Sequence, residues 1–140
     1  MQVNRVHHEG RPDLFKLTTK YSDSDLQTLL RQEHFPIFVA EDDLGNVVGH
    51  AFCQIIEHKG ERLLTDIKTL YIDDICVDAN ARKQSVGKHL YTAVCQFAKE
   101  INCYNITLNV WACNPGALAF YQKCGLVAQK YGLEKILEYN

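Results

Sequence analysis

The chain has 140 residues, of which 46% are hydrophobic and 23% are charged. This composition excludes a disordered chain, and the length fits a single domain spanning residues 1–140. Fifteen Lys and Arg against 17 Asp and Glu leave a net charge of -2, which excludes a nucleic-acid binder held by bulk positive charge. No apolar run approaches the roughly 20 residues of a membrane helix, and the first residues lack the apolar core of an export signal. We therefore expect a cytoplasmic protein with no nucleic-acid or membrane partner.

The first predicted element is a helix. Ser22 and Asp25 resemble a capping box, and the leucines that follow share one helical face, so this helix should end before Pro36. A short strand is predicted at 37–40, followed by a hairpin turn at 43–46 that contains Gly and Asn.

A longer strand is predicted at 47–57, with Gly49 as the position of a bulge. A polar loop at 58–65 separates it from another strand at 69–77. The period then changes, because apolar residues recur at spacings of three and four from Ser85 onward, which predicts a helix of about four turns.

The last third alternates between the two periods again. Residues 105–112 have apolar side chains on one face, which predicts a strand. Asn114 and Pro115 then form the N-cap and first position of a helix, and Gly125 follows that helix as its C′ residue. Terminal strands are predicted at 127–131 and 135–139. This order predicts an α/β or α+β fold in which a strand meander leads into a βαβ crossover.

The six cysteines form no Cys-x-x-Cys pair and no zinc-finger spacing with histidine, so no metal site is expected. Three disulfides and six reduced thiols both fit an even count. The lack of an export signal and the apolar surroundings favour reduced, buried thiols.

The stretch 77–88 contains the pattern most informative about ligand binding. A strand ends there, a polar loop follows, and a helix begins at the small residues Ser85 and Gly87. A helix N-terminus offers unpaired N–H groups and a partial positive charge, so it binds phosphate without a net basic protein. Basic residues surround this point: Arg82, Lys83 and Lys88. The same pattern also fits a solvated loop with incidental basic residues.

Residues 82–87, Arg-Lys-Gln-Ser-Val-Gly, resemble the signature Gln/Arg-x-x-Gly-x-Gly/Ala of the GNAT superfamily of N-acetyltransferases, with Ser85 in place of the first glycine. The preceding strand, 71–77, is similar to the strand before that signature. Residues 114–126 resemble the family's helix motif Asn-x-x-Ala-x-x-Phe-Tyr-x-x-x-Gly-Phe, with Leu126 where Phe is common. The resemblance runs from about residue 21 to the C-terminus.

The resemblance implies a mixed, twisted sheet with helices on both faces, split between two parallel strands by a cleft for acetyl-CoA. The split would fall between 69–77 and 105–112. By resemblance, backbone groups of Ile75, Cys76 and Val77 hold the pantetheine arm of CoA. The loop assigned to the pyrophosphate consists of Arg82, Lys83, Gln84, Ser85, Val86, Gly87 and Lys88.

Ser85 departs from the signature. Glycine is needed in such a loop where φ is positive or where a side chain would block the phosphate. Because Ser85 lies at a helix start, we expect a negative φ and a hydroxyl that can donate to a phosphate oxygen. Cofactor binding should then be weakened or adjusted rather than lost.

By resemblance, Tyr121 donates a proton to the CoA sulfur; packing on the preceding strand is its structural alternative. Asp73 and Asp74 are adjacent on a strand, so they should point to opposite faces. Either can take the proton of the amine, and Asp73 matches an acidic position of polyamine acetyltransferases; solvent exposure or helix capping is the alternative for both. Asn114 should cap its helix and, by resemblance, contact CoA.

The implied activity is direct acetyl transfer from acetyl-CoA to a primary amine of a small molecule or peptide. The alternative is a CoA-binding sensor or assembly module without catalysis, which Tyr121 and the two aspartates disfavour. Residues 1–20 are too short for the strand and helix with which the family usually opens. Either the first strand is missing, or a partner chain supplies the missing pairing, and an unpaired sheet edge favours a homodimer.

Overall fold

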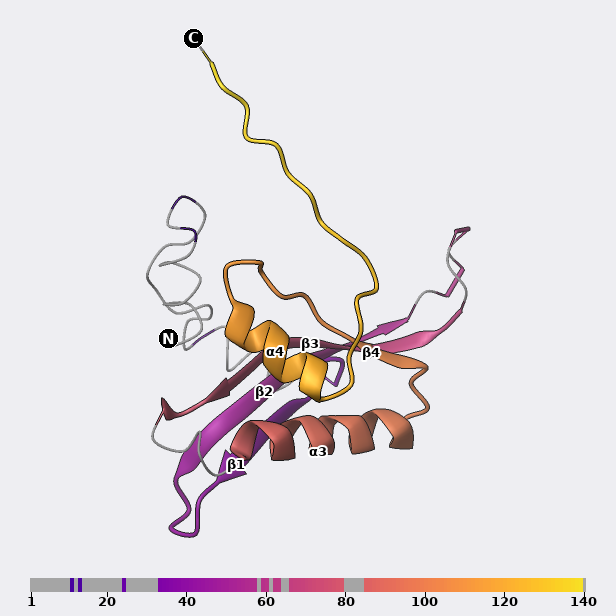
Figure 1. Cartoon of the computed structure of the whole chain (residues 1–140). Helices are drawn as coiled ribbons and strands as arrows, with labels where there is room; N and C mark the ends of the chain where they lie inside the picture. The colour runs from indigo at the N-terminus through magenta and orange to yellow at the C-terminus, as the bar shows by residue number, and fades with distance from the viewer. Residues whose placement is uncertain are drawn as a thin grey trace.

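The computed structural model describes residues 11, 13, 24, 33–57, 59–60, 62–63, 66–79 and 85–139. These residues form one four-stranded sheet, in the order β1-β2-β3-β4, with helices α3 and α4 (Figure 1). The elements are β1 (Ile37–Glu41), β2 (Val47–Glu57), β3 (Lys68–Val77), α3 (Val86–Glu100), β4 (Asn105–Thr107) and α4 (Pro115–Lys123). The predictions of a helix before Pro36 and of a missing first strand fall outside the described residues, apart from Ser24.

The β1–β2 hairpin is as predicted. The two strands are antiparallel, and Gly45 takes the positive φ of 82° that the tight turn requires. The Asp42 carboxylate accepts hydrogen bonds from the backbone N–H groups of Leu44 and Asn46, each at 2.9 Å. These bonds lower the pKa of Asp42 below its usual range. The sequence therefore encodes this corner locally.

Helix α3 covers the sheet with one apolar stripe. Its buried residues, Val86, Leu90, Val94 and Ala98, recur every fourth position. The sheet contributes Ala51, Cys53, Leu70 and Ile72, all at most 2% exposed, to the same core. The predicted period of this helix is confirmed.

Gly49 has a packing role rather than the predicted bulge role. It is paired on both sides, with Ala40 and Val77, and the register shift between β1 and β2 leaves Val48 as the extra residue. A Cβ at Gly49 would lie 3.0 Å from Leu90 Cδ1 and 3.2 Å from the Cys76 carbonyl oxygen. The helix therefore approaches β2 too closely for a side chain.

Gly49→Ala should lower the free energy of unfolding by about 1–3 kcal/mol, because the backbone carbonyl of Cys76 cannot move aside. Gly116→Ala is the matched control. A Cβ there meets only Asn114 Oδ1 at 4.0 Å, and alanine is the better helix former by about 0.5–1 kcal/mol. Urea denaturation should give opposite signs for the two variants, and equal signs would contradict this packing.

The parallel pair β3–β4 is shorter than predicted. It joins only Thr69 to Asn105, Leu70 to Ile106 and Tyr71 to Thr107. The strand predicted at 105–112 is therefore wrong in length, because from residue 108 the chain leaves β3 and runs toward α4. β3 itself continues to Val77.

Helix α4 begins and ends as its sequence predicts. Asn114 Oδ1 accepts a hydrogen bond from Ala117 N at 3.2 Å, and Pro115 occupies the first turn. At the other end, Gly125 has a φ of 98°, and the next residue, Leu126, donates to the Tyr121 carbonyl. None of the α4 residues is buried in the described part of the chain.

The predicted terminal strands at 127–131 and 135–139 are wrong for this structure. The chain there is extended but belongs to no strand, and every residue from 127 to 139 is exposed. It leaves the body of the molecule after α4 (Figure 1). A strand needs a neighbour, and no described part of the same chain supplies one.

All six cysteines are free thiols, and Cys53 is buried, as predicted for reduced packing residues. Among the described residues, no helix is both long and apolar enough to cross a bilayer, and no group of His, Cys, Asp and Glu has an arrangement suited to a metal ion.

Candidate active site

The predicted split in the sheet lies where β3 and the chain after β4 part. The parallel ladder ends at Tyr71 and Thr107, and six further residues of β3 extend beyond it. The last three of these, Ile75, Cys76 and Val77, are half-buried and are the positions predicted to hold the pantetheine arm. Asn109, in the departing chain, donates to the Tyr71 hydroxyl at 3.4 Å.

Three elements meet at the end of β3. A Cβ placed at Gly87 would lie 3.4 Å from the Phe120 ring and 3.6 Å from Val77 Cγ2. The first turn of α3, the middle of α4 and the end of β3 are therefore in contact distance of one another. A Cβ at Gly87 would make only ordinary van der Waals contacts with these two side chains.

The first turn of α3 is suited to an anion. Ser85 is its N-cap residue but makes no side-chain capping bond, and the turn contains no acidic residue. The N–H groups of Val86, Gly87 and Lys88 precede the first intrahelical bond, which His89 N donates to Ser85 O at 3.1 Å. Partial positive charge therefore collects here. Arg82, Lys83 and Gln84 lie outside the described residues.

The expected negative φ at Ser85 is wrong. Its φ is 60° and its ψ is 27°, which is the left-handed region. The chain turns sharply at this residue to enter α3, and glycine adopts that conformation without steric cost. This gives a physical reason for the glycine that the signature carries at this position.

Ser85→Gly should raise the free energy of unfolding by about 0.5–1 kcal/mol, because the left-handed conformation costs an L-residue about 1–2 kcal/mol and part of that gain is offset by glycine's unfolded-state entropy. Ser85→Ala is the control, since alanine keeps the steric strain. Urea titration of both variants tests this expectation, and an alanine variant as stable as the glycine variant would contradict it.

Tyr121 is half-buried on α4, and its ring makes an edge contact with Phe120 at a centroid distance of 5.1 Å. Burial raises the pKa of Tyr121 well above its usual range, and the negative charge of Asp74 raises this pKa further. The hydroxyl therefore keeps its proton at every ordinary pH. It also lies close enough to Asp74 for the two groups to interact electrostatically.

The two aspartates sit at a bulge in β3. Cys53 pairs with Ile72 and Phe52 with Asp74, so Asp73 is the extra residue. Strict alternation is interrupted at this bulge, and the opposite orientation of the two carboxylates stays a prediction. The core residues Ile72 and Ile75 are three positions apart, one more than strict alternation would give.

His50 is the site residue that sequence reasoning missed. Its Nε2 lies 3.5 Å from Asp74 Oδ2, and both side chains are mostly buried, at 33% and 22% exposure. The His50 ring also packs on Phe52 at a centroid distance of 4.7 Å. Alternation in β2 could have found it, because Ala51 and Cys53 are core positions and His50 lies on the other face.

The remaining groups near the site have structural explanations. Burial, with a contribution from the charge of Asp73, raises the pKa of Cys53 to about 12, so this thiol is not a nucleophile at neutral pH. Asn114 caps α4, as predicted. Its predicted contact with CoA stays a prediction.

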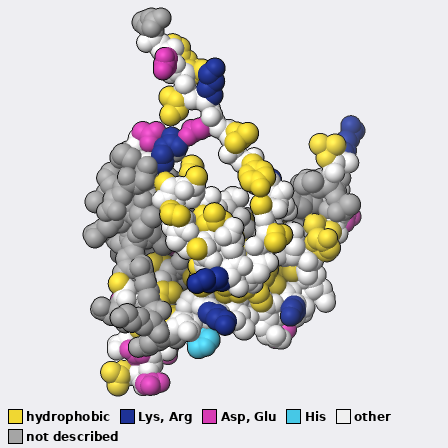
Figure 2. Space-filling model, in the orientation of Figure 1, with side chains coloured by type: hydrophobic (Ala, Val, Ile, Leu, Met, Phe, Trp, Pro, Cys, Tyr) yellow, Lys and Arg dark blue, Asp and Glu magenta, His cyan; other side chains and the backbone are white. Residues whose placement is uncertain are grey.

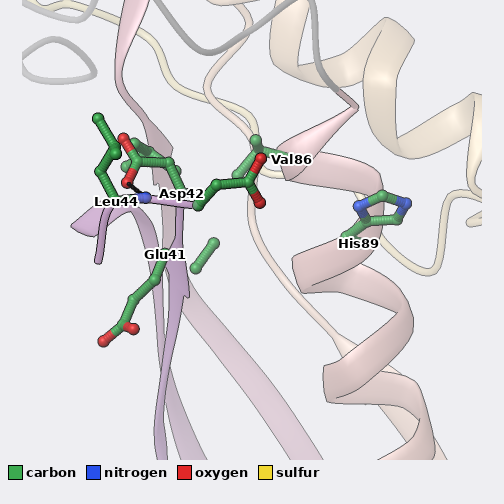
Figure 3. A pocket seen from close by; sticks show the side chains of 8 residues that line it. Glu41, Asp42, Leu44, Val86 and His89 are labelled. Carbon is green, nitrogen blue, oxygen red and sulfur yellow. Dashed lines mark hydrogen bonds between the residues drawn. The ribbon is translucent and has the colours of Figure 1, made fainter. Parts of the chain in front are cut away.

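A hollow of about 390 Å³ lies beside the start of α3, away from these groups (Figure 3). Val86 and His89 of α3 face the hairpin residues Glu41, Asp42 and Leu44 across it. Its lining includes three carboxylates, which would repel a phosphate. The hollow contains none of the residues at the β3–β4 split, so it is not the predicted cleft.

Known proteins share both the sequence pattern and the fold. The sequence model of the Acetyltransferase (GNAT) family matches residues 3–126. Glucosamine 6-phosphate N-acetyltransferase 1 of Oryza sativa subsp. japonica is 30% identical over 91 residues, which are 65% of this chain and 52% of that protein. "Probable glucosamine 6-phosphate N-acetyltransferase 2" of the same organism is 37% identical over 60 residues, or 43% of this chain and 34% of that protein. The chain thus spans about half or less of the length of these relatives.

Among solved structures, a mutant of the BH1408 protein from Bacillus halodurans superposes with a TM-score of 0.92 at 26% identity, covering 98% of this chain and 88% of that one. The family match covers most of the sequence, and the mixed sheet agrees with the fold that the resemblance implied. The chain belongs to the GNAT family of acetyltransferases.

Proposed function

We propose that this protein is an acetyl-CoA-dependent N-acetyltransferase that moves the acetyl group directly to a primary amine of a small molecule or peptide. The observation that carries the proposal is the meeting of Val77, Gly87 and Phe120 at the end of β3, six residues beyond its last pair with β4. The end of β3, the uncapped N-terminus of α3 and helix α4, which contains Tyr121, therefore lie together.

The described residues fit acetyl-CoA. The first turn of α3 offers N–H groups and Lys88 to the pyrophosphate, with no acidic residue in that turn. The backbone of Ile75, Cys76 and Val77 runs along the separated edge, where an amide-rich pantetheine arm can replace strand pairing. Arg82, Lys83 and Gln84 complete the proposed phosphate loop, and Asn114 lies at the start of α4.

When bound, acetyl-CoA supplies an electrophilic thioester. The neutral amine attacks its carbonyl carbon, the carbon–sulfur bond breaks, and the thiolate leaves while the amine nitrogen loses a proton. Asp74, paired with His50, is the proposed acceptor of that proton, directly or through one water. Asp73, at the bulge beside it, is the second carboxylate at this position. A backbone N–H of β3 is the proposed donor to the oxyanion.

Tyr121 is the proposed donor to the leaving sulfur. Its raised pKa keeps the hydroxyl protonated, and an unperturbed thiol has a pKa near 8.5, so full proton transfer from Tyr121 would be uphill. We therefore assign Tyr121 as a hydrogen-bond donor that stabilises the thiolate as charge develops on sulfur. This differs from a full general acid, because the tyrosine need not become tyrosinate.

The acceptor is proposed only as an amine class. The rice relatives are named for glucosamine 6-phosphate, which supports an amino sugar phosphate as the first compound to try. The six free thiols support a reducing, cytoplasmic location. Nothing in the net charge of -2 supports a nucleic-acid or anionic-membrane partner.

The test is acetyl transfer measured by mass detection of the acetylated amine, because six free thiols would interfere with thiol reagents. The panel contains glucosamine 6-phosphate, glucosamine, a polyamine and a peptide with a free N-terminus. Acetylation of any of these that exceeds the reaction without enzyme supports the proposal. Saturable acetyl-CoA binding with no acetylated product from any amine would favour the CoA-binding module instead.

A further inference from the structure

Helices α3 and α4 are in contact near the start of α3. A Cβ at Gly87 would lie 3.4 Å from the Phe120 ring. The two helices run in the same general direction, so the end of α4 lies beside the middle of α3 (Figure 1). Figure 2 shows hydrophobic side chains along the line between the two helices on the visible face. The contact at Gly87 therefore indicates which residues face each other further along α3 and α4.

Two cysteines follow this contact along the two helices. Tyr91 and Cys95 come four and eight residues after Gly87, so they lie on the same face of α3. Cys124 comes four residues after Phe120, and its N–H donates to the Phe120 carbonyl at 3.1 Å, so it continues the contacting face of α4. Further along both helices, the tyrosine and the two cysteines therefore come together.

The electrostatic interactions of these side chains agree with this placement. Burial raises the pKa of Tyr91 above its usual range, and a hydrogen bond that its hydroxyl donates to Cys95 and the charge of Cys124 raise this pKa further. Burial also raises the pKa of Cys124, with a contribution from Cys95. Both thiols are half-buried, unlike Cys53, which is buried. A small oxidant can therefore reach them.

Helix α4 is held weakly enough to adjust its position. A disulfide needs two Cα atoms within about 7 Å of each other. None of the α4 residues is buried in the described part of the chain, so a small movement of this helix toward α3 breaks little packing. A covalent link at Cys124 would restrain the helix that contains Tyr121, three residues earlier.

We propose that Cys95 and Cys124 form a reversible disulfide under oxidising conditions, and that this link holds α4 against α3. The inference does not rest on the proposed activity. The oxidant is a small disulfide such as oxidised glutathione. One cysteine thiolate attacks it, forms a mixed disulfide and releases one thiolate of the reagent, and the second cysteine thiolate then displaces the other half. The cysteine pair loses two protons and two electrons, and the reagent becomes two thiols.

The test is oxidation of the full chain with oxidised glutathione, followed by tryptic peptide mapping without reduction. Cys95 and Cys124 lie in the tryptic peptides 89–99 and 124–130, each of which contains a single cysteine, so their link gives one defined mass. In the monomer band of a non-reducing gel, this linked pair should exceed every other cysteine pair by at least about ten-fold, because the fold raises the effective concentration of the two thiols. The same oxidation in urea should remove this preference.

Serine variants show whether the link depends on these two thiols. Cys95→Ser and Cys124→Ser should each abolish the linked peptides, whereas Cys113→Ser, at another half-buried thiol, is the matched control and should keep them. Amide exchange in α4 should slow by at least about ten-fold in the oxidised wild type and stay unchanged in Cys124→Ser treated in the same way. A thiol reductant should reverse both effects in the wild type.

Three results would overturn the proposal. The first is a monomer in which both cysteines carry glutathione and are not linked to each other. The second is a linked pair that is no more abundant in the folded chain than in urea. The third is a linked protein in which the α4 amides exchange as fast as in the reduced protein.

Discussion

Replacing Tyr121 with phenylalanine is expected to lower kcat by about 100-fold while leaving the KM for acetyl-CoA within a few-fold of wild type. The phenyl ring keeps the contact with Phe120, so the change removes only the hydroxyl. That hydroxyl is the proposed donor to the leaving sulfur, and it acts when charge develops on the thiolate rather than in the bound ground state.

The pH dependence of this effect distinguishes a hydrogen-bond donor from a titrating acid. Burial and the charge of Asp74 hold the pKa of Tyr121 above its usual range, so the tyrosine stays neutral as the pH rises. The ratio of wild-type to variant kcat should therefore be constant between about pH 6 and pH 9. Tyr91→Phe, on α3, is the matched control for removal of a half-buried tyrosine hydroxyl and should retain activity. A Tyr121→Phe enzyme with full turnover would remove Tyr121 from the site.

Replacing Asp74 with asparagine is expected to lower kcat/KM for the amine by about 100-fold, because the variant keeps the shape of the side chain but cannot accept the amine proton. The loss should shrink for a less basic amine, because its nitrogen becomes more acidic on attack and loses its proton more readily without a base. Steady-state kinetics with two amines of different pKa measures this difference.

Asp73→Asn is the matched control, since the two carboxylates are neighbours, while Asp74 lies 3.5 Å from His50 and raises the pKa of Tyr121. His50→Gln should have a smaller effect than Asp74→Asn, because His50 positions the carboxylate. A larger loss in Asp73→Asn than in Asp74→Asn, with both proteins equally stable, would move the base to Asp73.

The parts of the fold that sequence predicted are those with local causes. The β1–β2 turn needs a positive φ, which Gly45 provides. The buried face of α3 needs an apolar residue at every fourth position. Asn114 caps the helix that begins directly after it. Each of these signals lies within a few residues of the structure that it specifies. Motif order then identified the family and located the β3–β4 split, because the signature and the α4 motif flank it.

The parts that sequence did not predict depend on distant neighbours. Ile106, Leu108 and Val110 alternate as a strand would, but pairing stops at Thr107 because β3 and the following chain part. Residues 127–139 have strand periodicity but no backbone hydrogen bond to a neighbouring strand within the described residues. The sequence pattern indicates that a segment can form a strand, but the strand forms only where a neighbouring strand pairs with it.

The candidate site was incomplete for the same reason. The positive φ at Ser85 arises from the path between β3 and α3, and the bulge at Asp73 arises from its pairing with β2. His50 belongs to the site only because the antiparallel register brings β2 beside Asp74. None of these relations is visible in one segment read by itself.

Calorimetric titration of the full chain with acetyl-CoA tests the central claim most directly, with NAD as a control ligand that shares the adenosine and pyrophosphate but lacks the pantetheine arm. Saturable, micromolar binding of acetyl-CoA without binding of NAD is the predicted result, and Ser85→Gly should bind at least as tightly. If acetyl-CoA gives no binding heat with either the wild type or Ser85→Gly, the result would contradict a CoA cleft between β3 and β4.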